Sequence, residues 1–346
     1  GIVRFENGGD LQLTSDDRSG SRRFEGSFEL SENDYFRIHL ANAEGVMSPA
    51  SDEFTVQVLE DQKPVISFNL PGRDRPVTNI EEVFTEVRAE DDYGLRSLQL
   101  NFSVNGGEEV SLPLEMPRGS RDITSSHTFY LEEFDLMPGD FVSYYARAQD
   151  AVSSAATDIF FLEVEPFDKE YRQSQMPGGA GAGGQQALEL SRQQKQIVVA
   201  TFTLIEEAEE IPAAEQIENS QTLALVQQRL ITQAQTIVER IERRGTALSD
   251  SRFRRMLEHL QQAVEHMGPA HESLNSVQPA EALPQEQKAL QQLLRAEALF
   301  NEVQVSFSQS GGGGQSSPQE LADLVDLELD RTKNQYETLQ QNREQQ

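Results

Sequence analysis

Four carboxylates have the types and spacing that could bind a metal ion. Glu90, Asp91 and Asp92 are consecutive, and Asp150 ends a later apolar segment. Oxygen ligands of this kind suit calcium, yet the Asp-x-Asp-x-Asp-Gly loop of a dedicated calcium site is absent. A tyrosine and a glycine follow Asp92, and Asp and Gly are preferred in turns, where Asp accepts bonds from the nearby backbone. We therefore interpret residues 90–94 as a turn between strands, with calcium as the competing hypothesis.

No other residues suggest catalysis or a cofactor. His259 and His266 are seven positions apart, so a helix would hold them about 10 Å apart along its axis, too far to share one metal ion. The glycine runs at 178–184 and 311–314 lack the Lys-Ser/Thr of a phosphate-binding loop, and there is no nucleophile elbow or dinucleotide fingerprint. With 58 acidic residues, carboxylate pairs are too common to single one out. The sequence predicts a protein that is not an enzyme.

Charge limits the possible partners. The chain has 29 basic against 58 acidic residues, a formal net charge of −29. Nucleic acids and anionic membrane surfaces are bound by Lys and Arg, so this charge opposes both. There is no cysteine, which excludes disulfides and thiolate metal sites. We expect protein partners or self-association, through the helices of residues 185–346.

The N-terminal half is β-rich and repeats itself. Short alternating segments bounded by Gly, Pro, Asn or Asp continue to about residue 170. Residues 33–58 align without a gap with residues 139–164, and an Asn-Gly-Gly sequence suited to a tight hairpin precedes each copy. This predicts immunoglobulin- or fibronectin-III-like sandwiches. Residues 63–167 would form a complete one, and residues 1–60 the C-terminal part of another, whose first strands would precede Gly1.

The C-terminal half is predicted to be helical. Residues 168–184 include a Gly-rich stretch and read as a linker. In residues 185–346, apolar residues recur at threes and fours between Gln- and Glu-rich faces, typical of an antiparallel helical bundle or coiled-coil region. The fourth helix is expected to begin after Pro284. A flexible Gly-rich loop at 308–317 precedes a last helix with a capping box. The apolar residues form a stripe along each predicted helix, and these stripes could pack within one chain or between chains.

Several segments, in order, resemble a known family. They are "AEDDYGLRSLQLNFSVNGGEE", "PGDFVSYYARAQD", "FFLEVEPFDKEYRQSQ", "SRQQKQIVVATFTLI" and "LADLVDLELDRTKNQYET". The succession resembles large bacterial envelope proteins that share a domain of unknown function and are often encoded near MoxR-type ATPases and von Willebrand A proteins. The resemblance implies immunoglobulin-like repeats, a Gln/Glu-rich helical region and a periplasmic or extracellular location. It also implies a membrane anchor outside the present sequence, and it carries no catalytic residues.

These observations predict a multidomain chain, all-β then all-α. Its expected role is structural: sandwiches act as spacers and present a helical assembly or docking region. The alternative is an immunoglobulin-like module that binds calcium or glycan.

Overall fold

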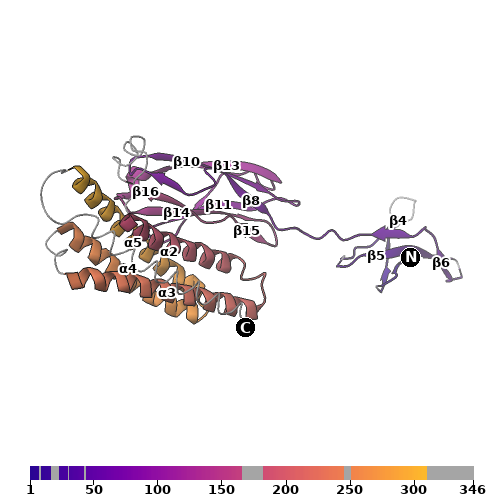
Figure 1. The fold of residues 1–346 in the computed structure, drawn as a ribbon. Helices are drawn as coiled ribbons and strands as arrows, with labels where there is room; N and C mark the ends of the chain where they lie inside the picture. Colours follow the sequence, from indigo (N-terminus) through magenta and orange to yellow (C-terminus); the bar gives the residue numbers. More distant parts are fainter. Residues whose placement is uncertain are drawn as a thin grey trace, which may run out of the picture. The chain divides into compact units, whose positions relative to one another are not determined.

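The computed structural model describes residues 1–7, 9–16, 23–29, 31–42, 44–165, 182–244 and 251–309. The chain divides into two compact units, Gly1–Gln62 (unit 1) and Lys63–Gln346 (unit 2) (Figure 1). Most of the predicted linker, most of the loop at 308–317 and the last predicted helix lie outside the described residues. Among the described residues, none of the helices has the combination of length and hydropathy that a membrane span needs.

Unit 1 contains one five-stranded antiparallel sheet and a small hairpin. Strand β5 is central: β1 pairs with its middle, β7 with its first three residues and β6 with its last three, and β2 extends the sheet beyond β1. The strands of the sheet are β1 (Ile2–Phe5), β2 (Asp10–Gln12), β5 (Asp34–Ala41), β6 (Met47–Pro49) and β7 (Phe54–Val56). The hairpin consists of β3 (Thr14–Asp16) and β4 (Arg23–Glu25).

Unit 2 begins with a β-sandwich. One sheet has the order β13-β10-β8, and the other has the order β12-β11-β14-β16-β9, with β15 also paired to β14. Strand β9 joins the second sheet in parallel with β16. The strands are β8 (Val65–Leu70), β9 (Arg75–Val77), β10 (Glu82–Glu90), β11 (Ser97–Val104), β12 (Val110–Pro113), β13 (Asp122–Tyr130), β14 (Phe141–Gln149), β15 (Ser154–Ala156) and β16 (Phe160–Val164).

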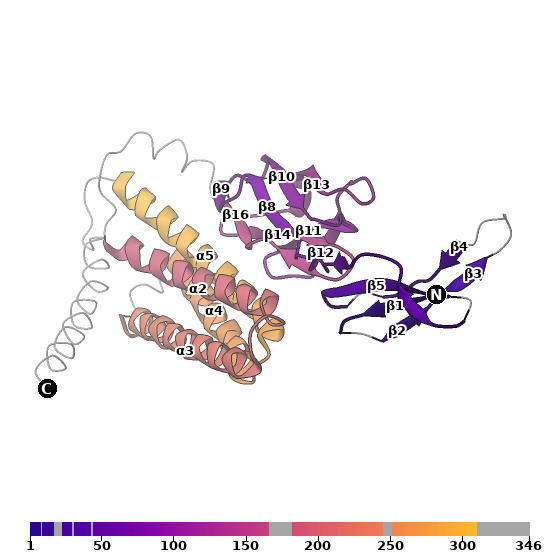
Figure 2. The same ribbon diagram turned by 90° about the vertical axis from the view of Figure 1, so that its right-hand side faces the viewer.

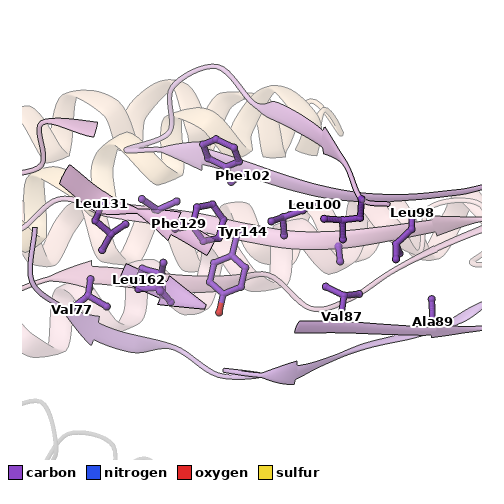
Figure 3. Packing of buried hydrophobic residues seen from close by; sticks show 14 of the residues in the cluster. Val77, Val87, Ala89, Leu98, Leu100, Phe102, Phe129, Leu131, Tyr144 and Leu162 are labelled. Carbon is purple, nitrogen blue, oxygen red and sulfur yellow. The ribbon is translucent and has the colours of Figure 1, made fainter. Parts of the chain in front are cut away.

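The core of this sandwich follows from alternation along the strands. Val83 and Val87 of β10 point inward from one sheet, and Leu98 and Leu100 of β11 from the other, because successive side chains of a strand face opposite ways. Figure 3 shows the two layers meeting around Tyr144, whose side chain is fully buried. The strands expected on either side of residues 90–94 are confirmed as β10 and β11.

The sequence repeat is also a repeat of strand order. In unit 1 the order is β2-β1-β5, with β6 and β7 both paired to β5. In unit 2 it is β12-β11-β14, with β15 and β16 both paired to β14. The described residues of unit 1 form no counterpart of the β13-β10-β8 sheet.

In the described part of the chain, four helices follow the sandwich and form a bundle (Figure 2). They are α2 (Ala182–Glu206), α3 (Ala213–Arg244), α4 (Ser251–Asn275) and α5 (Pro279–Gln309). Each helix contacts the next along the chain, and α2 also contacts α5, so the four close into a ring. The apolar stripes fill its core, with Leu230, Leu257, Leu260, Met267 and Leu293 among the buried residues. Amphipathic helices joined by short connections reach this arrangement because each can bury its stripe against two neighbours.

The expected start of the fourth helix is wrong. Helix α5 begins at Pro279, and Pro284 lies inside it. Proline suits the first helical position, where its missing N–H has no partner to lose, so Pro279 starts the helix. The same property made Pro284 look like a boundary, although the surrounding packing carries the helix through it.

Candidate functional site

The outer face of the large sheet packs against helices α2 and α5. Phe141 and Tyr145 of β14 and Phe161 of β16 form a buried cluster with Phe202 of α2 and Leu290 of α5; Ile159 and Val198 complete it. Residues between them, such as Val142 and Tyr144, face the sandwich core instead. Strand β14 is therefore apolar on both faces, a pattern found in strands that are covered on both sides. We call this contact the sandwich–bundle interface.

An aromatic pair lies within this interface. The rings of Tyr145 and Phe202 are 4.7 Å apart between centroids, in a tilted arrangement. The Tyr145 hydroxyl donates to Glu109 Oε1 at 3.0 Å. Burial, together with the charge of Glu109, raises the pKa of Tyr145, so its hydroxyl stays protonated and keeps donating. The two rings are thus buried among apolar side chains, while the tyrosine hydroxyl keeps a hydrogen-bond partner.

Two basic side chains bridge the sandwich and helix α2. Arg147 of β14 donates from Nη2 to Glu206 of α2 at 2.5 Å. Lys195 of α2 lies 3.0 Å from Asp74 Oδ2, also contacts Glu163 of β16, and sits 5.7 Å from the centre of the Phe161 ring. These groups are partly shielded from water, which strengthens their attraction relative to exposed pairs.

A third bridge connects the sandwich to helix α5. Asp140, which is 2% exposed, accepts from the backbone N–H of Met137 at 2.9 Å. It also accepts from Gln291 Nε2 at 3.0 Å and from Arg295 Nε at 2.9 Å. The sequence repeat aligns Asp140 with Asp34, which accepts hydrogen bonds from the backbone N–H groups of residues 7 and 35, both within unit 1. The same turn aspartate thus also holds a helix in unit 2.

Two glycines let α5 approach the sandwich closely. A Cβ on Gly139 would lie 2.7 Å from the Cα of Arg295, and a Cβ on Gly106 would lie 2.9 Å from the carbonyl oxygen of Pro284. Both glycines have positive φ, of 91° and 68°. A larger residue at either position would clash with helix backbone, which cannot move aside as a side chain can.

A buried carboxyl lies between α2 and α5. Glu286 is fully buried, and its Oε1 accepts from Thr201 Oγ1 at 2.9 Å. Its Oε2 has no hydrogen-bond partner among the described residues. Burial raises the pKa of Glu286 to about 8, with a smaller opposing effect from the Thr201 bond. The side chain is therefore largely uncharged at neutral pH, which lowers the cost of burying it.

Of the four calcium candidates, Glu90 ends strand β10, Asp91 and Asp92 lie in the turn that follows it, and Asp150 lies in a different turn after β14. Asp91 Oδ2 accepts from the N–H of Tyr93 at 3.0 Å and from the N–H of Gly94. Asp150 Oδ1 accepts from two N–H groups at 2.6 Å, and Oδ2 from a serine hydroxyl at 2.8 Å. Glu90 pairs with Arg88 at 2.7 Å, and Asp92 is exposed. These contacts agree with the turn interpretation, and calcium binding stays a prediction.

The described part of the chain holds no cluster of metal-binding side chains. No group of three or more His, Asp or Glu side chains there could hold a metal ion. His259 and His266 each contact a glutamine of α5, at 2.7 and 3.2 Å, and His271 contacts the carbonyl oxygen of Ala224 at 2.9 Å. These histidines join helices to one another.

The interface residues were not identified from the sequence. Lys195, Glu206 and Arg295 are ordinary members of a Gln- and Glu-rich helical pattern, and nothing in their spacing separates them from solvent-facing charges. One signal was present: apolar residues occupy both faces of the segment Phe141–Gln149. A strand of this kind must be covered twice.

Comparisons with known proteins add little. No protein-family model and no curated protein matches the sequence. The fibronectin(III)-like modules of Clostridium thermocellum CbhA are 18% identical over 47% of this chain and 77% of theirs, with a TM-score of 0.20. A GH family 64 laminaripentaose-producing β-1,3-glucanase from Paenibacillus barengoltzii is 10% identical over 33% of this chain and 22% of its own, with a TM-score of 0.18. Similarities this low carry no argument about function.

Proposed function

We propose that the chain is a non-enzymatic structural and interaction protein of the bacterial cell envelope. Immunoglobulin- or fibronectin-III-like sandwiches act as spacers, and the second of them is fixed to a helical bundle. Its partners are proteins or further copies of the chain. Its location is periplasmic or extracellular, with membrane attachment through an anchor outside the present sequence.

One observation carries the proposal: the sandwich–bundle interface. A buried aromatic cluster lies beside ion pairs of Arg147, Lys195 and Arg295 with acidic partners on the opposite side. The interface therefore combines buried apolar surface with directional ion pairs. Together they oppose both separation of the sandwich from the bundle and sliding of one along the other. A block of this kind holds its two ends at a fixed distance, which is what a spacer requires.

The burial of the apolar stripes of the helices indicates which surfaces remain for partners. Helices α2 to α5 bury their stripes in the bundle core, and α2 and α5 also bury residues against the sandwich. Large apolar side chains on the outer bundle surface are few in the described part, for example Ile217, Leu225 and Val226 of α3. Docking through the helices would therefore use polar surface, and apolar docking is expected on the β units.

The test is a distance measurement between spin labels. The chain has no cysteine, so two can be introduced cleanly: Ser126→Cys on β13 and Gln228→Cys on α3, both exposed. Pulsed electron paramagnetic resonance should give one narrow distance distribution. The control pair, Gln228→Cys with Glu258→Cys, lies within the bundle and reports the width due to the labels alone. A distribution much broader than the control would contradict a rigid spacer.

A further inference from the structure

Arginines are concentrated at one end of the helical bundle, although the chain as a whole has a net charge of −29. Residues 240–255 contain two acidic residues and six arginines, which are Arg240, Arg243, Arg244, Arg252, Arg254 and Arg255. Arg243 of α3 and Arg254 and Arg255 of α4 are exposed. We call these three residues the arginine patch.

Two residues of the arginine patch are placed against the dipole of their own helix. Arg254 and Arg255 lie within the first five residues of α4, and residues 251–254 include no acidic side chain. The N-terminal end of a helix is the positive end of its dipole, so acidic side chains stabilise it and basic ones oppose it. Stability of α4 therefore does not explain these arginines, whereas contact with an acidic partner does.

The arginine patch lies at the end of the bundle where α5 leaves it. His259 of α4 contacts Gln292 of α5 at 2.7 Å, and the later His266 contacts the earlier Gln285 at 3.2 Å. Helix α5 is therefore antiparallel to α4 and ends where α4 begins. Counted from the contact at Gln292, α5 extends about 14 Å beyond the first residue of α4, at 1.5 Å per residue.

An acidic segment follows α5 in the same sequence. Residues 318–330 contain five acidic residues and no basic one, and the capping box at their start predicts a helix. Leu321, Leu324 and Val325 would share one side of that helix, and Glu328 falls on the same line. A carboxylate among apolar contact residues needs a basic partner, and arginine binds carboxylates with paired hydrogen bonds.

The chain between α5 and this segment is long enough for the segment to return to the arginine patch. Helix α5 ends at Gln309, so residues 310–317 form the connection. Eight extended residues span about 26 Å, more than the about 14 Å by which α5 passes the start of α4. Leu299 and Phe300 of α5 are only partly buried against the bundle core, which leaves apolar surface for the returning segment.

We propose that residues 318–330 dock on the arginine patch of their own chain. Leu321, Leu324 and Val325 pack against the partly open end of the bundle core, and Glu328 pairs with an arginine of the patch. The chain thus supplies the acidic partner of its own basic surface, and an acidic segment of another protein would reach that surface only by displacing residues 318–330. This inference goes beyond the proposed function and does not depend on it.

The experiment is a spin-label distance measurement on the full chain. Labels are attached at Gln233→Cys, an exposed position of α3, and at Thr332→Cys, just after the acidic segment. The doubly labelled chain should give one narrow distance population. Salt at about 1 M should broaden the distribution, because it screens the ion pairs.

Charge reversal in the arginine patch should release the segment. Arg254→Glu combined with Arg255→Glu should shift the docking equilibrium about fivefold or more toward a broad distribution, because attraction becomes repulsion. Acidic residues suit the start of a helix, so α4 should remain intact in this variant. Adding Glu328→Arg to the variant should recover part of the narrow population, because opposite charges then face each other again.

The control is Arg118→Glu, which makes the same change of charge at an exposed position between β12 and β13 and should leave the distribution narrow. A broad distribution in the doubly labelled chain would overturn the proposal, and so would a narrow one that survives Arg254→Glu with Arg255→Glu. Equal broadening in Arg118→Glu would also overturn it, because net charge alone would then explain the effect. Dilution with excess unlabelled chain should preserve the narrow population, and its loss would show that the segment docks on another copy instead.

Discussion

Arg295 and Asp140 form an ion pair that joins helix α5 to the sandwich, with Nη2 and Oδ1 2.8 Å apart. The Asp140 side chain is 3% exposed and that of Arg295 is 24% exposed. The glycine before Asp140 is the residue that allows the helix backbone to come this close. One short turn of the sandwich therefore supplies both the space and the charge that fix α5.

Replacing Arg295 should destabilise unit 2. In Arg295→Ala, Asp140 stays buried with fewer of its hydrogen bonds, and we expect a loss of about 2–3 kcal/mol in the free energy of unfolding. Urea denaturation monitored by circular dichroism measures this. The control is Arg243→Ala, which removes an exposed pair with Glu239 and should cost about 0.5 kcal/mol or less. Equal losses in the two variants would mean that burial adds nothing to the Arg295 pair.

Two alanine substitutions distinguish the backbone strain of positive φ from steric contact with helix α5. Gly139→Ala and Gly119→Ala both place a side chain at positive φ, which costs about 1 kcal/mol. At Gly119 nothing lies within 4 Å of the new Cβ, whereas at Gly139 it meets the backbone of Arg295. Gly139→Ala should therefore lower the melting temperature clearly more and broaden the distance distribution between Ser126→Cys and Gln228→Cys. If the two variants melt alike, α5 does not rest against this turn.

Glu286 should make stability depend on pH. Its folded-state pKa, about 8, lies above the ordinary carboxyl value of 4.5 because the side chain is buried. Between these values the folded chain keeps a proton that the unfolded chain releases, so stability falls as pH rises. Each pKa unit corresponds to about 1.4 kcal/mol, so the loss from pH 4.5 to 8 should reach a few kcal/mol.

Glu286→Gln removes this ionisation. The variant should be more stable than the unmodified chain at pH 8–9, and its stability should vary less between about pH 4.5 and 8. Urea denaturation at several pH values measures both effects. Glu281→Gln, an exposed position in the same helix, is the control and should follow the unmodified chain. A difference between Glu286→Gln and the unmodified chain that does not change with pH would show that the carboxyl is not buried as described.

The aromatic pair should contribute much of the apolar stability of the interface. Phe202→Ala removes a 4% exposed ring from its contact with Tyr145 and should cost about 3–4 kcal/mol. Leu225→Ala, at an exposed position, should cost less than about 0.5 kcal/mol. Thermal unfolding followed by tyrosine absorbance and by helical circular dichroism shows whether sandwich and bundle unfold together. A small loss in Phe202→Ala would mean that the interface is loose.

The turn and calcium interpretations of residues 90–94 predict opposite results. If Asp91 only accepts backbone N–H groups, Asp91→Ala should cost about 1 kcal/mol, Asp92→Ala should cost little, and calcium should leave the melting temperature unchanged. If calcium binds, it should raise the melting temperature, and Asp91→Asn with Asp92→Asn should abolish that rise. Differential scanning calorimetry with calcium or with chelator distinguishes the two.

The sequence by itself determined the local elements. Alternation at Val83 and Val87 and at Leu98 and Leu100 marked strands, because neighbouring side chains of a strand face opposite ways. Apolar recurrence at Leu257, Leu260 and Met267 marked a helix for the corresponding geometric reason. The repeat between residues 33–58 and 139–164 predicted two related β domains, and the matching order of strands in the two sheets is what the structure adds to it.

Only the tertiary structure decided which surfaces meet. The ion pair of Arg147 and Glu206 joins residues far apart in the chain, and so does the approach of Gly139 to Arg295. Periodicity shows that a helix has an apolar side, but it does not show whether a helix or a sheet covers that side, because burial against either removes the same area from water. Charged side chains at such a boundary look in sequence like those in solvent, and the fold alone shows that Lys195 and Asp140 are held between two layers.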